Sequence, residues 1–228
     1  MRLTESSPEA AREGLHAMIA RPDGSLFAVW LDLRTKGTRL IGSMSTDAGK
    51  TWSKNTLVYE SPDGMICQCC HPSLSVDEKG GLWVMWRNAL NGSRDFYVTS
   101  STDGVHFTAA RKLGTGTWKL DACPMDGGGF SVENGKVTSA WRRESRIYLS
   151  KADASEVLID DGKDVALAGG YLAWTKGGGI QLLAPGAKTP ERVAADGGFP
   201  ALIALPDTGS VLLAWETKTS IETRVLRQ

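Results

Sequence analysis

Short runs of alternating apolar and polar residues recur along the chain, and no long run with a helical period competes with them. Five apolar runs end in tryptophan, and they cover residues 25–30, 81–86, 136–141, 170–174 and 210–215. Sequences with Gly, Asp or Asn that suit tight turns precede four of these runs. The pattern predicts a repeated antiparallel meander of short strands.

A third alternating strand follows each tryptophan, and a weaker outer strand follows four of the five third strands. The third strands cover residues 39–45, 94–101, 146–152, 179–184 and 222–227, and the outer strands cover residues 56–60, 110–114, 156–159 and 191–194. We therefore predict an all-β fold, a single β-propeller with five four-stranded antiparallel blades. A stacked sandwich of the same meanders is the alternative.

The predicted propeller is one domain over residues 1–228, and its last blade lacks an outer strand. The repeat units cover residues 14–65, 66–118, 119–163, 164–196 and 197–228, and residues 1–13 complete the last one. Residues 1–5 would supply the missing strand. Pairing of the N- and C-terminal strands would then close the ring and remove an exposed sheet edge.

A conspicuous motif follows the third strand of the first unit. Residues 45–52 read STDAGKTW, which matches the Asp-box pattern S-x-D-x-G-x-T-W at every fixed position, and residues 101–107 carry a shorter version. The two motifs resemble those of the sialidase, or BNR-repeat, β-propeller superfamily. In such a turn Asp accepts hydrogen bonds from backbone N–H groups and Gly permits positive φ. The resemblance implies a structural role for Asp47 and Asp103, on the rim away from the active site.

Sialidase activity does not follow from this resemblance. The enzymes of the superfamily use an Arg triad, a Tyr nucleophile with its Glu and an acid/base Asp on six blades, and this set is not recoverable here. Arg87 and Arg142 follow the blade Trp in units two and three, where Asp32 and Glu216 stand in units one and five. A sialidase-like glycoside hydrolase using Arg87 and Arg142 is therefore the alternative function, and solvated strand ends are the plainer explanation.

The most unusual segment is residues 67–72, which read CQCCHP. His71 lies fifteen residues before Trp86, and His16 and Asp126 occupy nearly the same place in units one and three. Connections between blades deliver such residues to one end of the central channel. We predict a site there, with Asp126 assisting, formed by His16, Cys67, Cys69, Cys70, His71 and Cys123.

Thiolates and imidazoles suit Cu(I) or Zn(II), and the nearby Met65 and Met125 favour copper over zinc. The leading hypothesis is a non-catalytic, metal-binding propeller with copper or zinc as its cofactor. A C-x-C-C segment with a later Cys-Pro also resembles some exported bacterial Asp-box proteins, which implies one shared site.

Other states of the cysteines remain open. A disulfide from Cys67 or Cys70 to Cys123, or a vicinal Cys69–Cys70 bond, would staple the blades, and reduced buried cysteines are a further alternative. Haem is disfavoured although the segment contains C-x-x-C-H, because Pro72 follows at once and no helix surrounds it.

Composition limits the partners and the location. Lys plus Arg equal Asp plus Glu at 26 each, so no strong field favours nucleic acid or an anionic membrane. The expected partners are a metal ion and a glycan or protein, with Trp118 as a candidate aromatic at the channel mouth. Residues 1–13 are polar and contain no signal-peptide core. We expect a periplasmic or secreted protein if an export signal was removed, and a cytoplasmic one otherwise.

Overall fold

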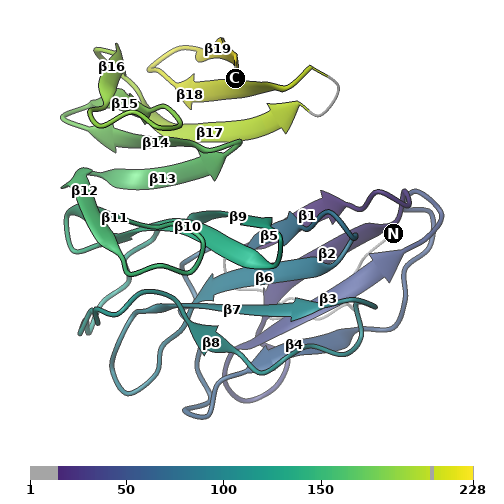
Figure 1. Cartoon of the computed structure of the whole chain (residues 1–228). Helices are drawn as coiled ribbons and strands as arrows, with labels where there is room; N and C mark the ends of the chain where they lie inside the picture. The colour runs from purple at the N-terminus through teal and green to yellow at the C-terminus, as the bar shows by residue number, and fades with distance from the viewer. Residues whose placement is uncertain (1–14, 206–207, 228) are drawn as a thin grey trace. The chain divides into compact units, whose positions relative to one another are not determined.

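The computed structural model describes residues 15–205 and 208–227. Within them, β-strands form five antiparallel sheets, four of four strands and one of three (Figure 1). The strands divide between two compact units. The first runs to Gly127 and includes Val132–Lys136, and the second comprises Gly128–Ser131 and the chain from Val137 onward.

Two sheets belong to the first unit, and each is a meander of strands consecutive in the chain. The first sheet contains β1 (His16–Ala20), β2 (Leu26–Asp32), β3 (Arg39–Ser45) and β4 (Thr56–Glu60). The second contains β5 (Ser73–Val76), β6 (Leu82–Arg87), β7 (Phe96–Ser101) and β8 (Arg111–Lys112).

The remaining three sheets follow the same order. The third contains β9 (Gly129–Glu133), β10 (Lys136–Arg143), β11 (Arg146–Ser150) and β12 (Val157–Asp161). The fourth contains β13 (Lys163–Ala168), β14 (Tyr171–Lys176), β15 (Gly179–Leu183) and β16 (Glu191–Ala194). The fifth contains β17 (Gly198–Leu205), β18 (Ser210–Glu216) and β19 (Ile221–Arg227).

These sheets confirm the five meanders predicted from the sequence, with the strand that ends near each tryptophan in second place. The prediction that residues 1–5 complete the last blade lies outside the described residues.

The tryptophans of the second strands are large apolar rings that must be buried against other side chains. Trp86 and Trp174 are fully buried, and Trp30 and Trp141 are nearly so. In the first unit the Trp86 ring packs 4.5 Å from the Tyr59 ring, centroid to centroid. Phe27, Val29 and Leu31 of β2 belong to the same apolar cluster. Burying such large rings contributes much of the favourable free energy of folding.

Both Asp boxes form the predicted turns. Asp47 accepts hydrogen bonds from the Thr51 backbone N–H (2.8 Å) and from the hydroxyls of Thr51 and Ser45. Asp103 accepts from the backbone N–H groups of Val105 and His106, both at 2.8 Å. The hydrogen-bonding groups around each carboxylate, three at Asp47 and four at Asp103, are local to the turn, so both aspartates act in folding.

Replacing Asp47 with alanine should lower the melting temperature at neutral pH, because three donors lose their acceptor. The Thr51 hydrogen bonds lower the pKa of Asp47 to about 2. Its stabilisation is therefore present above the unfolded-state pKa and is lost as pH falls through about 2. Thermal unfolding of Asp47→Ala, compared with the exposed Asp196→Ala, checks this expectation. Equal melting temperatures for both variants at neutral pH would contradict it.

Candidate functional site

The cysteine segment of the first unit is tied to the end of β6. Ile66 bridges Asn88, and the Cys67 backbone N–H donates to the Arg87 carbonyl at 3.1 Å. The loop that carries Cys123 is tied to the start of β7, because the Arg94 N–H donates to the Trp118 carbonyl at 2.8 Å. The Arg94 side chain also donates to the Ala122 carbonyl at 3.4 Å. These backbone links bring the two cysteine-bearing loops together.

The four cysteines form one disulfide and one thiol pair. Cys69 and Cys123 are bonded. Cys67 and Cys70 are free thiols, only 3% and 1% exposed, with their Sγ atoms 3.2 Å apart. The bond to Cys123 therefore comes from Cys69, not from Cys67 or Cys70, and the vicinal Cys69–Cys70 alternative is wrong. The reason is the turn itself, which directs Cys67 and Cys70 inward and leaves Cys69 partly exposed beside the exposed Cys123.

The structure does not assemble the six-residue metal site expected from the sequence. Among the described residues, the group of metal-ligating side chains contains Cys67, Cys69 and Cys70, without His16 or His71. Cys69 and Cys123 share electrons in a disulfide, so neither offers a thiolate. His16 is an exposed residue at the start of β1.

His71 and Asp126 have other partners. The His71 ring lies against Gly127, where a Cβ would come within 2.1 Å of its Nε2. Desolvation by the surrounding atoms lowers the pKa of His71, against the opposing charge of Asp126. The Asp126 carboxylate pairs with the Arg87 guanidinium at 2.7 Å. Asp126 is thus engaged in an ion pair rather than placed to assist a metal.

Arg87 is a buried structural cation. It is 1% exposed, donates to the Arg94 carbonyl at 2.7 Å, and lies over the rings of Phe96 and Trp118 at 4.2 and 5.2 Å. Trp118 is itself 9% exposed, so it packs on Arg87 instead of forming an exposed aromatic surface. Arg87 is therefore not a solvated strand end. Its side chain is also too little exposed to contact a substrate.

The two thiols have different acidities. The hydrogen bond with Cys70 lowers the pKa of Cys67 to about 7, against the effect of burial, and the charges of Arg87 and Arg94 add to the lowering. The same hydrogen bond and burial raise the pKa of Cys70. One proton is therefore shared between the sulfurs when Cys67 ionises.

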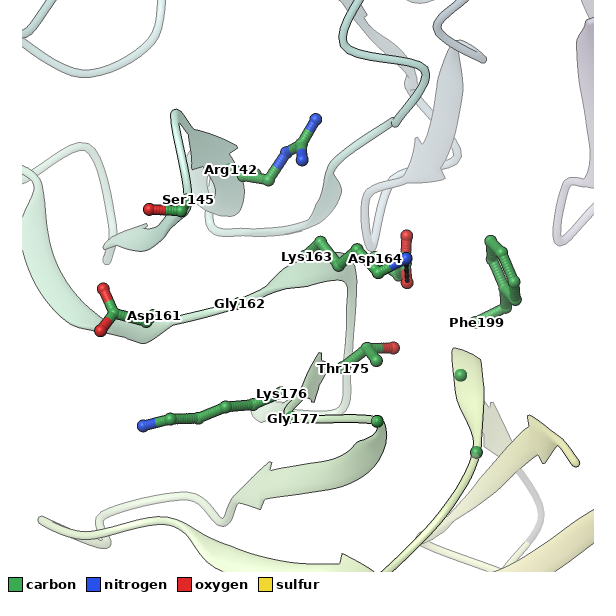
Figure 2. Close-up of a pocket in the computed structure, with 13 residues that line it drawn as sticks. Arg142, Ser145, Asp161, Gly162, Lys163, Asp164, Thr175, Lys176, Gly177 and Phe199 are labelled. Atoms are coloured by element: carbon green, nitrogen blue, oxygen red, sulfur yellow. Dashed lines mark ion pairs between the residues drawn. The ribbon is translucent and has the colours of Figure 1, made fainter.

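A second candidate site is a cavity of 480 Å³ in the second unit (Figure 2). Strand ends and turns form it, with Arg142 at the end of β10, Lys163 and Asp164 at the start of β13, and Thr175 near the end of β14. Phe199, near the start of β17, completes one side. Asp161 and Lys176 also line the cavity, but Figure 2 shows their side chains pointing away from the group formed by Asp164, Thr175 and Phe199.

The same backbone device appears in the fourth and fifth sheets. Gly162 precedes β13 with φ 156°, and Gly197 precedes β17 with φ 130°. A Cβ on either would come within 2.7 Å of an indole carbon, of Trp174 for Gly162 and of Trp215 for Gly197. Only glycine lets the chain approach the blade tryptophan so closely.

Two positions after each of these glycines, a residue adopts the left-handed conformation. They are Asp164 (φ 54°) and Phe199 (φ 50°), at irregular register in β13 and β17. The Phe199 ring is exposed and lies 5.6 Å from the Lys163 ammonium, which also pairs with Asp164 at 3.6 Å. The two bulges thus aim an acid and an aromatic ring into one cavity.

Thr175 adds a buried polar group. Its hydroxyl oxygen is buried, and within residues 15–205 and 208–227 no hydrogen-bond partner is present for it. A buried hydroxyl at a cavity wall is a donor and acceptor for a ligand.

Solved structures similar to this chain include an arabinanase, an arabinofuranosidase and a polysaccharide lyase. An α-L-arabinanase of Penicillium chrysogenum with arabinobiose matches at TM-score 0.59 and 12% identity, over 94% of this chain and 76% of the other. An α-L-arabinofuranosidase of Fusarium graminearum with an iminosugar inhibitor matches at TM-score 0.62 and 11% identity, over 94% and 77%. A polysaccharide lyase matches at TM-score 0.55 and 12% identity, over 93% and 57%.

Like these structures, the chain has a five-bladed β-propeller fold. This fold rules out the stacked sandwich. No protein-family model and no curated protein matches the chain. No helix in the described part of the chain is long and apolar enough to cross a membrane.

Arg142 is the one residue of this cavity that the sequence predicts as a site candidate. In this propeller its other residues come from bulges and turns, and a glycine followed two residues later by Asp164 or Phe199 is too weak a signal to read from one sequence. The repeated Gly-x-Asp and Gly-x-Phe triplets, each ahead of a blade tryptophan, are the only trace of it.

Titration of the folded propeller should show one thiolate with a midpoint near pH 7, because the Cys70 hydrogen bond favours the Cys67 anion. Ultraviolet thiolate absorbance, followed against pH, measures it. Cys67→Ser should abolish this step, and Cys123→Ser should not. A first thiolate appearing only near the pKa of an ordinary cysteine, about 8.5, would contradict the assignment.

Proposed function

We propose that this propeller binds a carbohydrate in the cavity of the second unit. The observation that carries the proposal is Phe199, a bulky residue in the left-handed conformation whose ring is 60% exposed at a cavity wall. Such a conformation costs about 1–3 kcal/mol, and it persists where the surrounding structure enforces it, most often at functional sites. Nothing in the packing of the fifth sheet requires an exposed ring there.

The chemistry around the ring suits a sugar. An exposed aromatic face packs against the C–H face of a pyranose or furanose, and the polar groups around it suit the sugar hydroxyls. Arg142, Asp164 and Thr175 offer donors and acceptors on the walls of the same cavity. The volume of 480 Å³ lies within the usual range of about 300–1,000 Å³ for small-ligand sites, which favours one or two sugar rings.

Two of the similar solved structures support this ligand class, since one contains arabinobiose and the other an iminosugar inhibitor. The directions of the Asp161 and Asp164 side chains favour binding over hydrolysis. Glycoside hydrolysis needs two carboxyl groups flanking one bond, and the Asp161 side chain points away from that of Asp164 (Figure 2). The Cys69–Cys123 disulfide favours a periplasmic or secreted location, where such bonds persist.

Replacing Phe199 with alanine should weaken saccharide binding at least about tenfold, equivalent to about 1.4 kcal/mol, because the stacking face is lost. Isothermal titration with arabinobiose and a panel of neutral and acidic disaccharides measures it. Ile203→Ala is the matched control, since Ile203 is 58% exposed on the same strand. Equal affinity of both variants, or no binding to any sugar, would overturn the proposal, and turnover of aryl glycosides would favour the hydrolase alternative.

A second candidate function is metal binding by the thiol pair alone. Cys67 and Cys70 place two buried sulfurs 3.2 Å apart, and soft thiolates favour Cu(I) over harder cations. Two sulfurs are fewer than the tetrahedral ligands that zinc takes, so the pair favours copper. The supporting observation is the proximity of these sulfurs. His16, His71 and Asp126 contribute nothing to it.

The wild-type propeller should bind about one Cu(I) per chain in competition with a chromophoric chelator, and Cys70→Ser should lose it, because one sulfur is missing. The double variant Cys69→Ser/Cys123→Ser keeps the thiol pair and should retain the ion. Elemental analysis by mass spectrometry gives the stoichiometry. Retention by Cys70→Ser, or loss in the double variant, would exclude the two-sulfur site.

A further inference from the structure

The thiol pair and the disulfide are in direct contact. The Cys67 Sγ lies 3.2 Å from the Cys70 Sγ and 3.7 Å from the Cys69 Sγ, the near sulfur of the disulfide. A free thiol this close to a disulfide sulfur is positioned for thiol–disulfide exchange. A disulfide that serves only as a staple gains nothing from such a neighbour, because exchange would undo it.

The four sulfurs also differ in exposure along their order of contact. Cys70 and Cys67 are 1% and 3% exposed, Cys69 is partly exposed, and Cys123 is exposed. Cys67 contacts both the buried Cys70 and the outer Cys69, so it links the thiol pair to the disulfide. The order runs from a buried thiol, through Cys67 and Cys69, to the surface.

We propose that the four cysteines form a dithiol–disulfide exchange centre, in which the buried Cys67/Cys70 pair stores two electrons that the outer Cys69/Cys123 pair passes to an external disulfide. This activity is independent of the proposed carbohydrate binding. It uses the same thiols as the candidate copper site, so the thiol pair would hold either the electrons or the metal.

The first step moves the disulfide inward. Cys67, as its thiolate after releasing a proton to solvent, attacks the Cys69 Sγ. The Cys67–Cys69 bond forms, the Cys69–Cys123 bond breaks, and Cys123 leaves with the electron pair and takes up a proton. The number of thiols is unchanged, so this step needs no oxidant or reductant.

The second step resolves this intermediate. Cys70, after losing its proton, attacks the Cys67 Sγ, so that the Cys67–Cys70 bond forms and Cys69 leaves as a thiolate that is protonated. The outer thiols of Cys69 and Cys123 can then reduce an external disulfide to two thiols while they return to their own disulfide. The chain ends with two disulfides, and the external molecule has gained the two electrons.

Native-state alkylation tests the inward step. The folded protein is treated with N-ethylmaleimide and a metal chelator, without reductant, quenched in acid and mapped by peptide mass spectrometry. In the wild type we expect labels on Cys69 and Cys123 and a Cys67–Cys70 disulfide, because alkylation captures the released outer thiols. Cys67→Ser/Cys70→Ser, which keeps the outer disulfide and lacks both nucleophiles, should remain unlabelled.

Single variants separate the steps. Cys70→Ser should stop after the first, with a Cys67–Cys69 bond and a label on Cys123 alone. Cys67→Ser keeps one free thiol, Cys70, so at most one outer cysteine can be released, and its labelling should be at least tenfold slower than in the wild type. If circular dichroism shows that a Cys67 variant does not fold, Cys70→Ser decides: an intact Cys69–Cys123 bond in it overturns the proposal. Labels on Cys67 and Cys70 alone in the wild type overturn it as well.

Electron transfer outward is tested with oxidised glutathione. The wild type should release two equivalents of reduced glutathione per chain. The variant Cys67→Ser/Cys70→Ser should release none. Phe199→Ala should behave as the wild type in every arm, so a failure of carbohydrate binding and a failure of exchange are distinguishable. No release from the wild type would overturn the outward transfer.

Discussion

The buried guanidinium of Arg87 is the interaction on which the site in the first unit depends. A cation with 1% exposure is costly unless its charge and donors are satisfied. The Asp126 carboxylate and the Arg94 carbonyl accept hydrogen bonds from its two terminal nitrogens, and the faces of Phe96 and Trp118 enclose it. Removing one partner of a buried pair generally costs about 3–5 kcal/mol, so these groups hold one another in place.

That arrangement positions the cysteines. Cys67 donates its backbone N–H to the Arg87 carbonyl, while Asp126 fixes the loop that follows Cys123 from the other side of the guanidinium. The sulfurs meet because both loops are anchored to one arginine and to the β6–β7 turn. The hydrogen bond with Cys70 is the main cause of the lowered pKa of Cys67, and the charge of Arg87 adds to it, so the residue that positions this sulfur also favours its thiolate.

The meanders, the tryptophan-ended strands and the Asp boxes could be predicted from the sequence, because each depends on local patterns of apolar residues and on turn chemistry. The clustering of the cysteines also followed, since neighbouring blades bring their connecting loops together. Their pairing did not. Which cysteine of residues 67–70 faces outward depends on the path of one irregular turn, and Cys69 differs from Cys70 by a single position. Arg87 shows the same limit, because its burial depends on Phe96, Trp118 and Asp126 together.

The candidate site residues and the Asp boxes lie at opposite ends of their sheets. In an antiparallel meander the end of the second strand lies beside the start of the first and third strands. Arg87, Arg142 and Thr175 lie at or near the ends of second strands, and Phe199 lies near the start of a first strand. The Asp boxes follow third strands, at the opposite end of the sheet. Turns that stabilise the sheet are therefore separated from irregular segments that carry exposed, strained or reactive groups. An insertion or bulge at the end that carries the irregular segments can then change the chemistry of a blade. It leaves the hydrogen bonds of the Asp-box turns at the other end undisturbed.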